Sequence, residues 1–143
     1  MIKDIYYPTD NIVKEVSAIQ KDDKIILKVR YESNEYIKQP NFGFVIYDNY
    51  ENPIFGTNPI KNGITDFGIP KKRGEVKIVI NSPHLVNGSY PVSVWFNDGL
   101  AYSNHIFHKD NCLNLNVNDM NISFIHKESN LGNIIPDLKF IFN

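Results

Sequence analysis

The sequence holds little that would build a disulfide framework, a multi-cysteine metal centre or a membrane span. Only one of its 143 residues is a cysteine, Cys112, which excludes intrachain disulfides and zinc sites that need several thiolates. No run of about 18 apolar residues occurs, so no transmembrane helix is predicted. The net charge is −1, whereas a nucleic-acid-binding domain normally carries a basic excess, so nucleic acid is not an expected partner.

Motifs for nucleotide binding and catalysis are also missing. The chain contains no G-x-x-x-x-G-K-[ST], no G-x-G-x-x-G and no G-x-S-x-G, so we expect no enzyme and no cofactor. Metal-ligating residue types gather only around His105, His108, Asp110 and Cys112. On a strand, the odd spacing of the two histidines would send them to opposite faces. The usual zinc spacings are absent as well, so no metal site is predicted.

Alanine is scarce and aromatic residues are plentiful, which favours strands over helices. Alanine, the best helix former, occurs only as Ala18 and Ala101, and aromatics make up 13% of the chain. Apolar and polar residues alternate with period two through most of the sequence, as in half-buried strands. The alternation predicts strands over residues 24–31, 42–47, 53–58, 75–80, 89–96 and 112–117. Strands at this spacing indicate one all-β domain built as an antiparallel β-sandwich.

Three local features qualify this pattern. Residues 12–16 suit either a short helix or a strand, and residues 61–72 read as a long loop. Pro91 lies inside a strand pattern, yet it cannot donate a ladder hydrogen bond. We therefore expect it at an edge or a bulge.

The second face of the predicted strands carries an unusual mixture of aromatic and polar residues. If Val92, Val94 and Phe96 fill the core, then Trp95 and its alternating neighbours face outward. Such a face suits sugars, because aromatic rings cover pyranose C–H groups while amides and hydroxyls bond sugar hydroxyls. The strand polarity predicts a carbohydrate site made of Tyr47, Phe55, Thr57, Ser93, Trp95, Asn97 and His105. The alternative is that Trp95 packs under a loop or docks another protein, since aromatics are equally typical of interfaces.

The order of several segments resembles a known family. The segments are PNFGFVIYD at 40–48, PIFGTN at 53–58 and LVNGSYPVSV at 85–94, followed by LNLNV at 113–117. Together they resemble the C-terminal carbohydrate-binding domain of Wzt-type ATP-binding subunits of O-antigen polysaccharide ABC transporters. The resemblance extends over about residues 22–137.

The resemblance implies an immunoglobulin-like β-sandwich of about 8–10 strands that is not an enzyme. It implies that residues 1–143 form a single carbohydrate-binding domain with a leader at 1–10. Residues 111–143 would hold C-terminal strands exchanged between the protomers of a homodimer. Such a module recognises an O-antigen-type polysaccharide, at its non-reducing end, for export. Its partners are then the transporter's ATP-binding domain and membrane subunit, at the cytoplasmic side of the inner membrane. The alternative function is a protein–protein interaction module with no sugar ligand.

Overall fold

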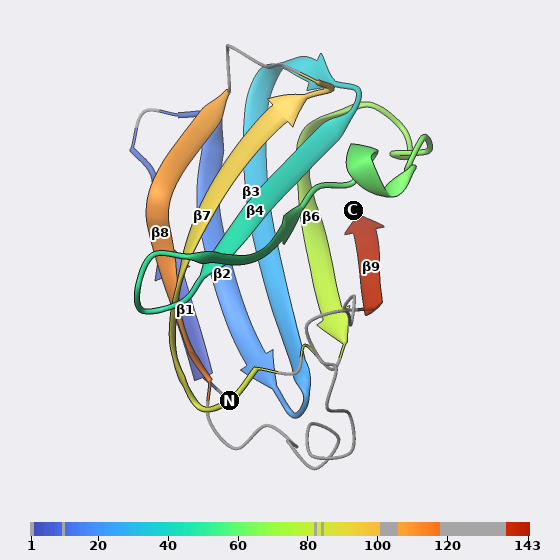
Figure 1. Cartoon of the computed structure of the whole chain (residues 1–143). Coiled ribbons are helices and arrows are strands. Elements are labelled where there is room, and N and C mark those ends of the chain that lie inside the picture. Colours follow the sequence, from blue (N-terminus) through green and yellow to red (C-terminus); the bar gives the residue numbers. More distant parts are fainter. Residues whose placement is uncertain (1, 10, 82, 84, 101–105, 118–136) are drawn as a thin grey trace.

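The computed structural model describes residues 2–9, 11–81, 83, 85–100, 106–117 and 137–143. These described residues form nine strands and one short 3₁₀ helix, η1 (Ile60–Asn62), and they contain no α-helix. The strands pack as two antiparallel sheets, one in front of the other in Figure 1. The predicted all-β sandwich and its number of strands are confirmed.

One sheet has five strands and the other has four. The five-stranded sheet has the order β1 (Ile2–Tyr6), β2 (Val13–Lys21), β3 (Lys24–Ile37), β6 (Lys71–Asn81) and β9 (Asp137–Phe142). The four-stranded sheet has the order β5 (Pro53–Thr57), β4 (Pro40–Tyr47), β7 (Gly88–Asp98) and β8 (Phe107–Val117). Every neighbouring pair is antiparallel.

The core lies between the sheets and is built from the apolar side chains that occupy alternate positions along the strands. Its largest fully buried side chains are Phe42, Phe44, Phe96, Ile25, Leu27, Ile78, Ile80, Val13, Val16, Val29, Val76 and Val92. Tyr31 of β3 crosses the layer and packs on Phe96 of β7, with ring centroids 5.1 Å apart. Burial raises the pKa of the Tyr31 phenol above its ordinary value, with Asp98 adding to the effect.

The structure describes part of each end of the chain. Residues 2–6, expected within a leader, form the edge strand β1 paired with β2. Within the C-terminal region, β8 ends at Val117 and β9 pairs with β6 of the same chain, while residues 118–136 lie outside the described part. The alternative of a helix or a strand at residues 12–16 is decided in favour of a strand, because residues 13–21 form β2.

Pro91 lies where the ladder between β4 and β7 ends, as expected for a proline at the end of strand pairing. The last pair between β4 and β7 is Ile46 with Val92, so Pro91 lies just beyond the reach of β4. On the other side Pro91 stands opposite Asn114, whose backbone N–H turns away from β7 and donates to Asp4 Oδ2 at 2.9 Å. In an antiparallel pair of this kind, the backbone of Pro91 faces the β4 side. Its missing N–H therefore costs no ladder bond, and the sheet surface is left uncovered there.

Candidate functional site

A pocket of about 240 Å³ lies on the outer face of the four-stranded sheet, where β4 has ended. It is lined by Tyr47, Glu51, Pro91, Ser93, Asp110 and Asn111. Tyr47 and Ser93 belong to the predicted site, and the other four come from the β4–β5 turn, β7 and β8. The pocket is smaller than most sites for drug-sized ligands, so it suits a single sugar ring.

A bulge in β8 creates one wall of the pocket. Val92 pairs with Leu113 and Val94 pairs with Lys109, so the single residue Ser93 faces three residues, 110–112, of β8. Asn111 takes a left-handed conformation with φ 50°, which asparagine tolerates better than most residues. Its backbone N–H donates to Ser93 Oγ at 3.1 Å. The bulge therefore holds Asp110 and Asn111 out from the sheet, and it occupies the hydroxyl of Ser93.

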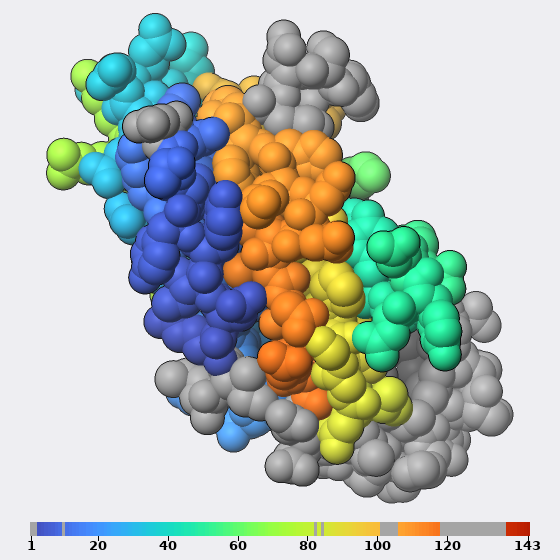
Figure 2. Space-filling view, turned by 90° about the vertical axis from the view of Figure 1, so that its left-hand side faces the viewer, coloured from blue at the N-terminus to red at the C-terminus, as the bar shows by residue number. Residues whose placement is uncertain are grey.

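The turn between β4 and β5 forms the opposite wall. Asp48 Oδ1 accepts the backbone N–H groups of Tyr50 at 2.8 Å and Asn52 at 2.9 Å. These hydrogen bonds, led by the one from Asn52, hold the pKa of the Asp48 carboxyl below its ordinary value. Glu51 sits in this turn with φ 65°, and the neighbouring Tyr50 ring is 85% exposed. Figure 2 shows the turn projecting beside β7 and β8, and β1 packed along β8.

Trp95 lies on the same face, two residues along β7 from Ser93. It stands opposite Gly43 of β4 on one side and His108 of β8 on the other. A side-chain carbon built on Gly43 would overlap the Trp95 indole, so the ring occupies the space that this glycine leaves open. The half-buried indole thus lies across β4, on the same sheet face as the pocket residue Ser93.

Two predicted site residues lie on the wrong side of the sheet for this pocket. Phe55 pairs with Ile46 and Thr57 pairs with Phe44, so both side chains share the core-facing side of β4. The Phe55 ring packs on Phe44 at 5.9 Å. Thr57 is buried, and its hydroxyl accepts a hydrogen bond from Asn62 Nδ2 at 2.8 Å, which holds η1. The expectation that these two residues join the Trp95 face is wrong, because the β4–β5 register sets their side.

The remaining predicted residues have separate outcomes. Asn97 lies on the expected face but is only 3% exposed. Its partner across the strands is Asn41, whose side chain accepts the backbone N–H of Ile60 at 3.2 Å, so the loop with η1 covers this end. His105 lies outside the described residues. The structure therefore brings Tyr47 and Ser93 together in the pocket and places Trp95 on the same sheet face, two residues along β7 from Ser93.

Sequence reasoning did not assign Glu51, Pro91, Asp110 or Asn111 to the site. Asp110 and Asn111 come close because of the bulge, and a bulge shifts the alternation that strand polarity relies on. The only local signals were the polar run at 108–111 and the turn-forming sequence at 48–52. Neither indicates by itself that the two segments face each other.

Metal-ligating side chains do not gather into a site among the described residues, where no group of three His, Cys, Asp or Glu could hold an ion. His108 Nε2 lies 3.1 Å from Asp110 Oδ1. Cys112, two residues further on, is buried in the core, and burial raises the pKa of its thiol to about 12.

We expect Cys112 to be nearly inert toward a thiolate-selective reagent in the native protein. A rise in pKa from 9.0 to about 12 lowers the thiolate fraction about a thousandfold at pH 8. Stopped-flow labelling with a disulfide reagent should give this slow rate in buffer and a fast rate in denaturant. Fast labelling under native conditions would contradict the burial of Cys112.

A second hollow, of about 400 Å³, lies beside β3, β6 and Asn143. Its charged groups are engaged with one another, since Glu32 pairs with Arg30 at 3.0 Å and with Arg73 at 3.4 Å. It contains no aromatic platform comparable to Trp95, because its one lining aromatic, Tyr31, is 2% exposed. The pocket beside Trp95 is therefore the better candidate for ligand binding.

The chain was compared with solved structures and with curated proteins. Among solved structures, the chain is similar to a catalytically inactive OgpA from Akkermansia muciniphila in complex with an O-glycopeptide substrate. That similarity has a TM-score of 0.40 and 20% identity, and it covers 78% of this chain but only 32% of OgpA, so it carries no functional argument. No curated protein matches the chain. Among the described residues, no helix is long and apolar enough to cross a membrane.

The family model of the Wzt C-terminal domain matches residues 6–130. The matched range takes in β2 to β8, and with them both walls of the pocket. This range is most of the chain, and it agrees with the order of segments noted in the sequence. The family implies a non-catalytic module in an ABC-transporter context, with glycan binding in general. The chain belongs to the Wzt C-terminal domain family.

Proposed function

We propose that this domain is a glycan-recognition module that binds an O-antigen-type polysaccharide for export by an ABC transporter. The observation that carries the proposal is the pocket between the β4–β5 turn and the β8 bulge, with Trp95 beside it. Family membership supports the transporter context. The non-reducing end of the polysaccharide is the part that a pocket sized for one sugar ring would take.

The chemistry of the surface supports a sugar rather than an apolar ligand. Tyr47 and Pro91 offer apolar walls, while Glu51, Asp110 and Asn111 offer hydrogen-bonding groups. Beyond the pocket, the Trp95 indole can stack on the next ring of the chain, since aromatic faces pack against sugar C–H groups. The exposed Tyr50 ring stands at the rim of the turn, close to the same ligand. Binding of this kind needs no catalytic group and no cofactor.

The transporter context sets the expected partners and location. We place the domain on the cytoplasmic side of the inner membrane, next to the transporter's ATP-binding domain and membrane subunit. There, glycan binding would be coupled to ATP hydrolysis by the neighbouring domain. Single-site affinity for a sugar end is expected to be modest, and two sites in a dimer would raise avidity on a polymer.

The homodimer is expected to use the C-terminal strands. Among the described strands, β9 lies at the edge of the five-stranded sheet and pairs with β6 alone, so a partner's β9 could take the same place. We expect light scattering of the purified chain to give twice the mass of 16.5 kDa. A monomeric mass across the working concentration range would contradict the exchange.

The test of the proposed function is direct binding. The purified domain should bind bacterial surface polysaccharides on a glycan array, and calorimetry should confirm the affinity in solution. Because Trp95 is the only tryptophan, its fluorescence should change on addition of the bound glycan. Absence of binding to every polysaccharide, together with stable binding to a protein partner through this face, would favour the interaction-module alternative.

A further inference from the structure

We infer that the pocket selects an uncharged or amino-substituted sugar with free hydroxyl groups and rejects an anionic one. The inference rests on the proposed function and specifies the class of sugar that the pocket takes. It follows from which charged groups line the pocket and how each of them is held.

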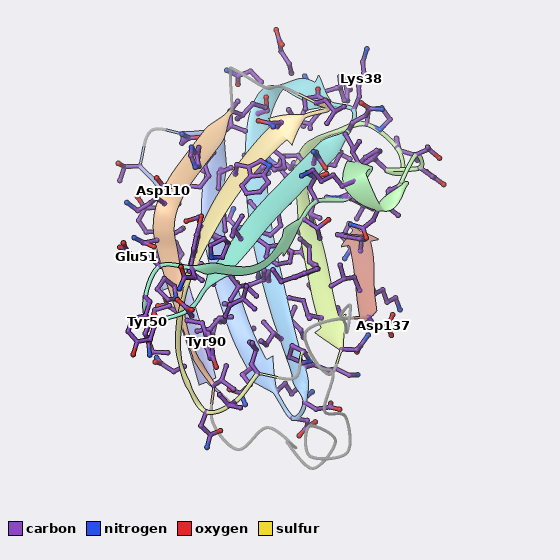
Figure 3. All side chains as sticks on the ribbon, viewed as in Figure 1. Lys38, Tyr50, Glu51, Tyr90, Asp110 and Asp137 are labelled. Carbon is purple, nitrogen blue, oxygen red and sulfur yellow. The ribbon has the colours of Figure 1, made fainter. Side chains whose placement is uncertain are left out.

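Two carboxylates face the same pocket from opposite walls. Glu51 comes from the β4–β5 turn and Asp110 comes from the β8 bulge, and both line the cavity. Figure 3 labels both residues on the side of the molecule where the turn approaches β8. The Asp110 side chain is 76% exposed, so a ligand can reach it although its Oδ1 lies 3.1 Å from His108 Nε2.

Hydrogen bonds hold the backbone near both carboxylates. Glu51 lies at φ 65° in a turn closed by hydrogen bonds from Tyr50 and Asn52 to Asp48. Asp110 precedes Asn111, whose backbone N–H is bonded to Ser93. These bonds keep both residues at the walls of the pocket, so an incoming negative charge is met by a carboxylate from each side.

No basic residue lines the pocket among the described residues. The nearest lysine and histidine side chains in sequence are each engaged in another contact. Lys109 Nζ lies 5.1 Å from the centroid of the Tyr6 ring, on the core-facing side of the sheet. His108 is bonded to Asp110 itself, at 3.1 Å. A uronate or phosphate group in this pocket would therefore meet two carboxylates with no lining cation, and like charges at close range repel.

The hydrogen-bond capacity of the pocket also favours donors on the ligand. Ionised carboxylates only accept hydrogen bonds, while sugar hydroxyls and ammonium groups donate them. Such bonds to a charged acceptor are shorter and stronger than neutral ones. A free hydroxyl or an amine is therefore bound better than the same position blocked by an O-methyl group.

The test compares matched sugars in one array. The gluco, galacto and manno series are each printed as the neutral hexoside, the free 2-amino hexoside and the 6-carboxylate. We expect the neutral and amino forms of the recognised series to bind at least about tenfold more tightly than the uronate form. Tighter or equal binding of the uronate overturns the inference while leaving the proposed function intact. Absence of binding to any of these sugars, and to the polysaccharides, overturns both.

Charge-neutralising variants identify the groups responsible. Glu51→Gln and Asp110→Asn keep the size of the side chains, and together they should remove most of the discrimination against the uronate. The control Glu35→Gln makes the same charge change at an exposed position of β3, in the other sheet, and should leave the preference unchanged. If the double variant keeps the full preference, or if Glu35→Gln relaxes it equally, Glu51 and Asp110 are not its cause.

Discussion

Replacing Trp95 with alanine is expected to weaken glycan binding by about 30-fold, equivalent to ~2 kcal/mol. The indole lies on the same sheet face as the pocket, and in the proposed mode of binding it offers a flat face to the ring that follows the terminal sugar. Trp95→Ala should cost only about 1–2 kcal/mol of stability, because part of the ring remains in contact with water. Calorimetry with the bound polysaccharide measures the first effect, and thermal unfolding measures the second.

The matched control removes an aromatic ring from the other sheet. Tyr36 of β3 is 60% exposed, and Lys72 Nζ lies 5.1 Å from its ring centroid. Tyr36→Ala should leave glycan affinity unchanged, whereas Trp95→Ala should lower it sharply. Unchanged affinity in Trp95→Ala would rule out the indole as a binding platform.

Replacing Gly43 with valine should displace the Trp95 ring and abolish most of the same affinity. A Cβ at position 43 would overlap the indole, so the ring must leave the face of β4. Overpacking of this kind typically costs about 1–3 kcal/mol. The single tryptophan reports the movement, and its emission should shift to the red as the ring becomes more exposed to water.

A double-mutant cycle separates displacement of Trp95 from a general strand defect. In the Trp95→Ala background the obstacle is gone, so Gly43→Val should cost little stability or even stabilise the β-strand. If the cost of Gly43→Val is the same in both backgrounds, the indole is not what the new side chain meets. The assignment of Gly43 as the space for the tryptophan would then be wrong.

The sequence predicted the fold because the fold depends on local alternation. Period-two patterning in residues 89–96 follows from burial of one side of β7, and the same rule holds in β3, β4 and β6. The order of these segments also indicated the family that the comparison identified. Trp95 and Ser93 were placed on the outer face correctly, because the alternation along β7 is continuous and the bulge lies in β8.

The details of the site depended on register and on contacts between distant segments. Alternation within β5 gives two possible sides for Phe55 and Thr57, and only pairing with Ile46 and Phe44 chooses the core side. Asn97 is covered because the backbone N–H of Ile60 donates to its cross-strand neighbour Asn41, which holds the loop with η1 over this end of the sheet.

The amino-acid sequence by itself determined the all-β class and the family, and it determined which alternate residues of the main strands face the core. Tertiary structure decided where the pocket opens, because β4 ends before Pro91 and the β8 bulge meets the β4–β5 turn only in space. It also placed Glu51 and Asp110 in one pocket, although the 58 residues 52–109 lie between them in the chain. The physical reason is that strand pairing brings distant segments together, while side-chain patterning records only which face of each strand is buried.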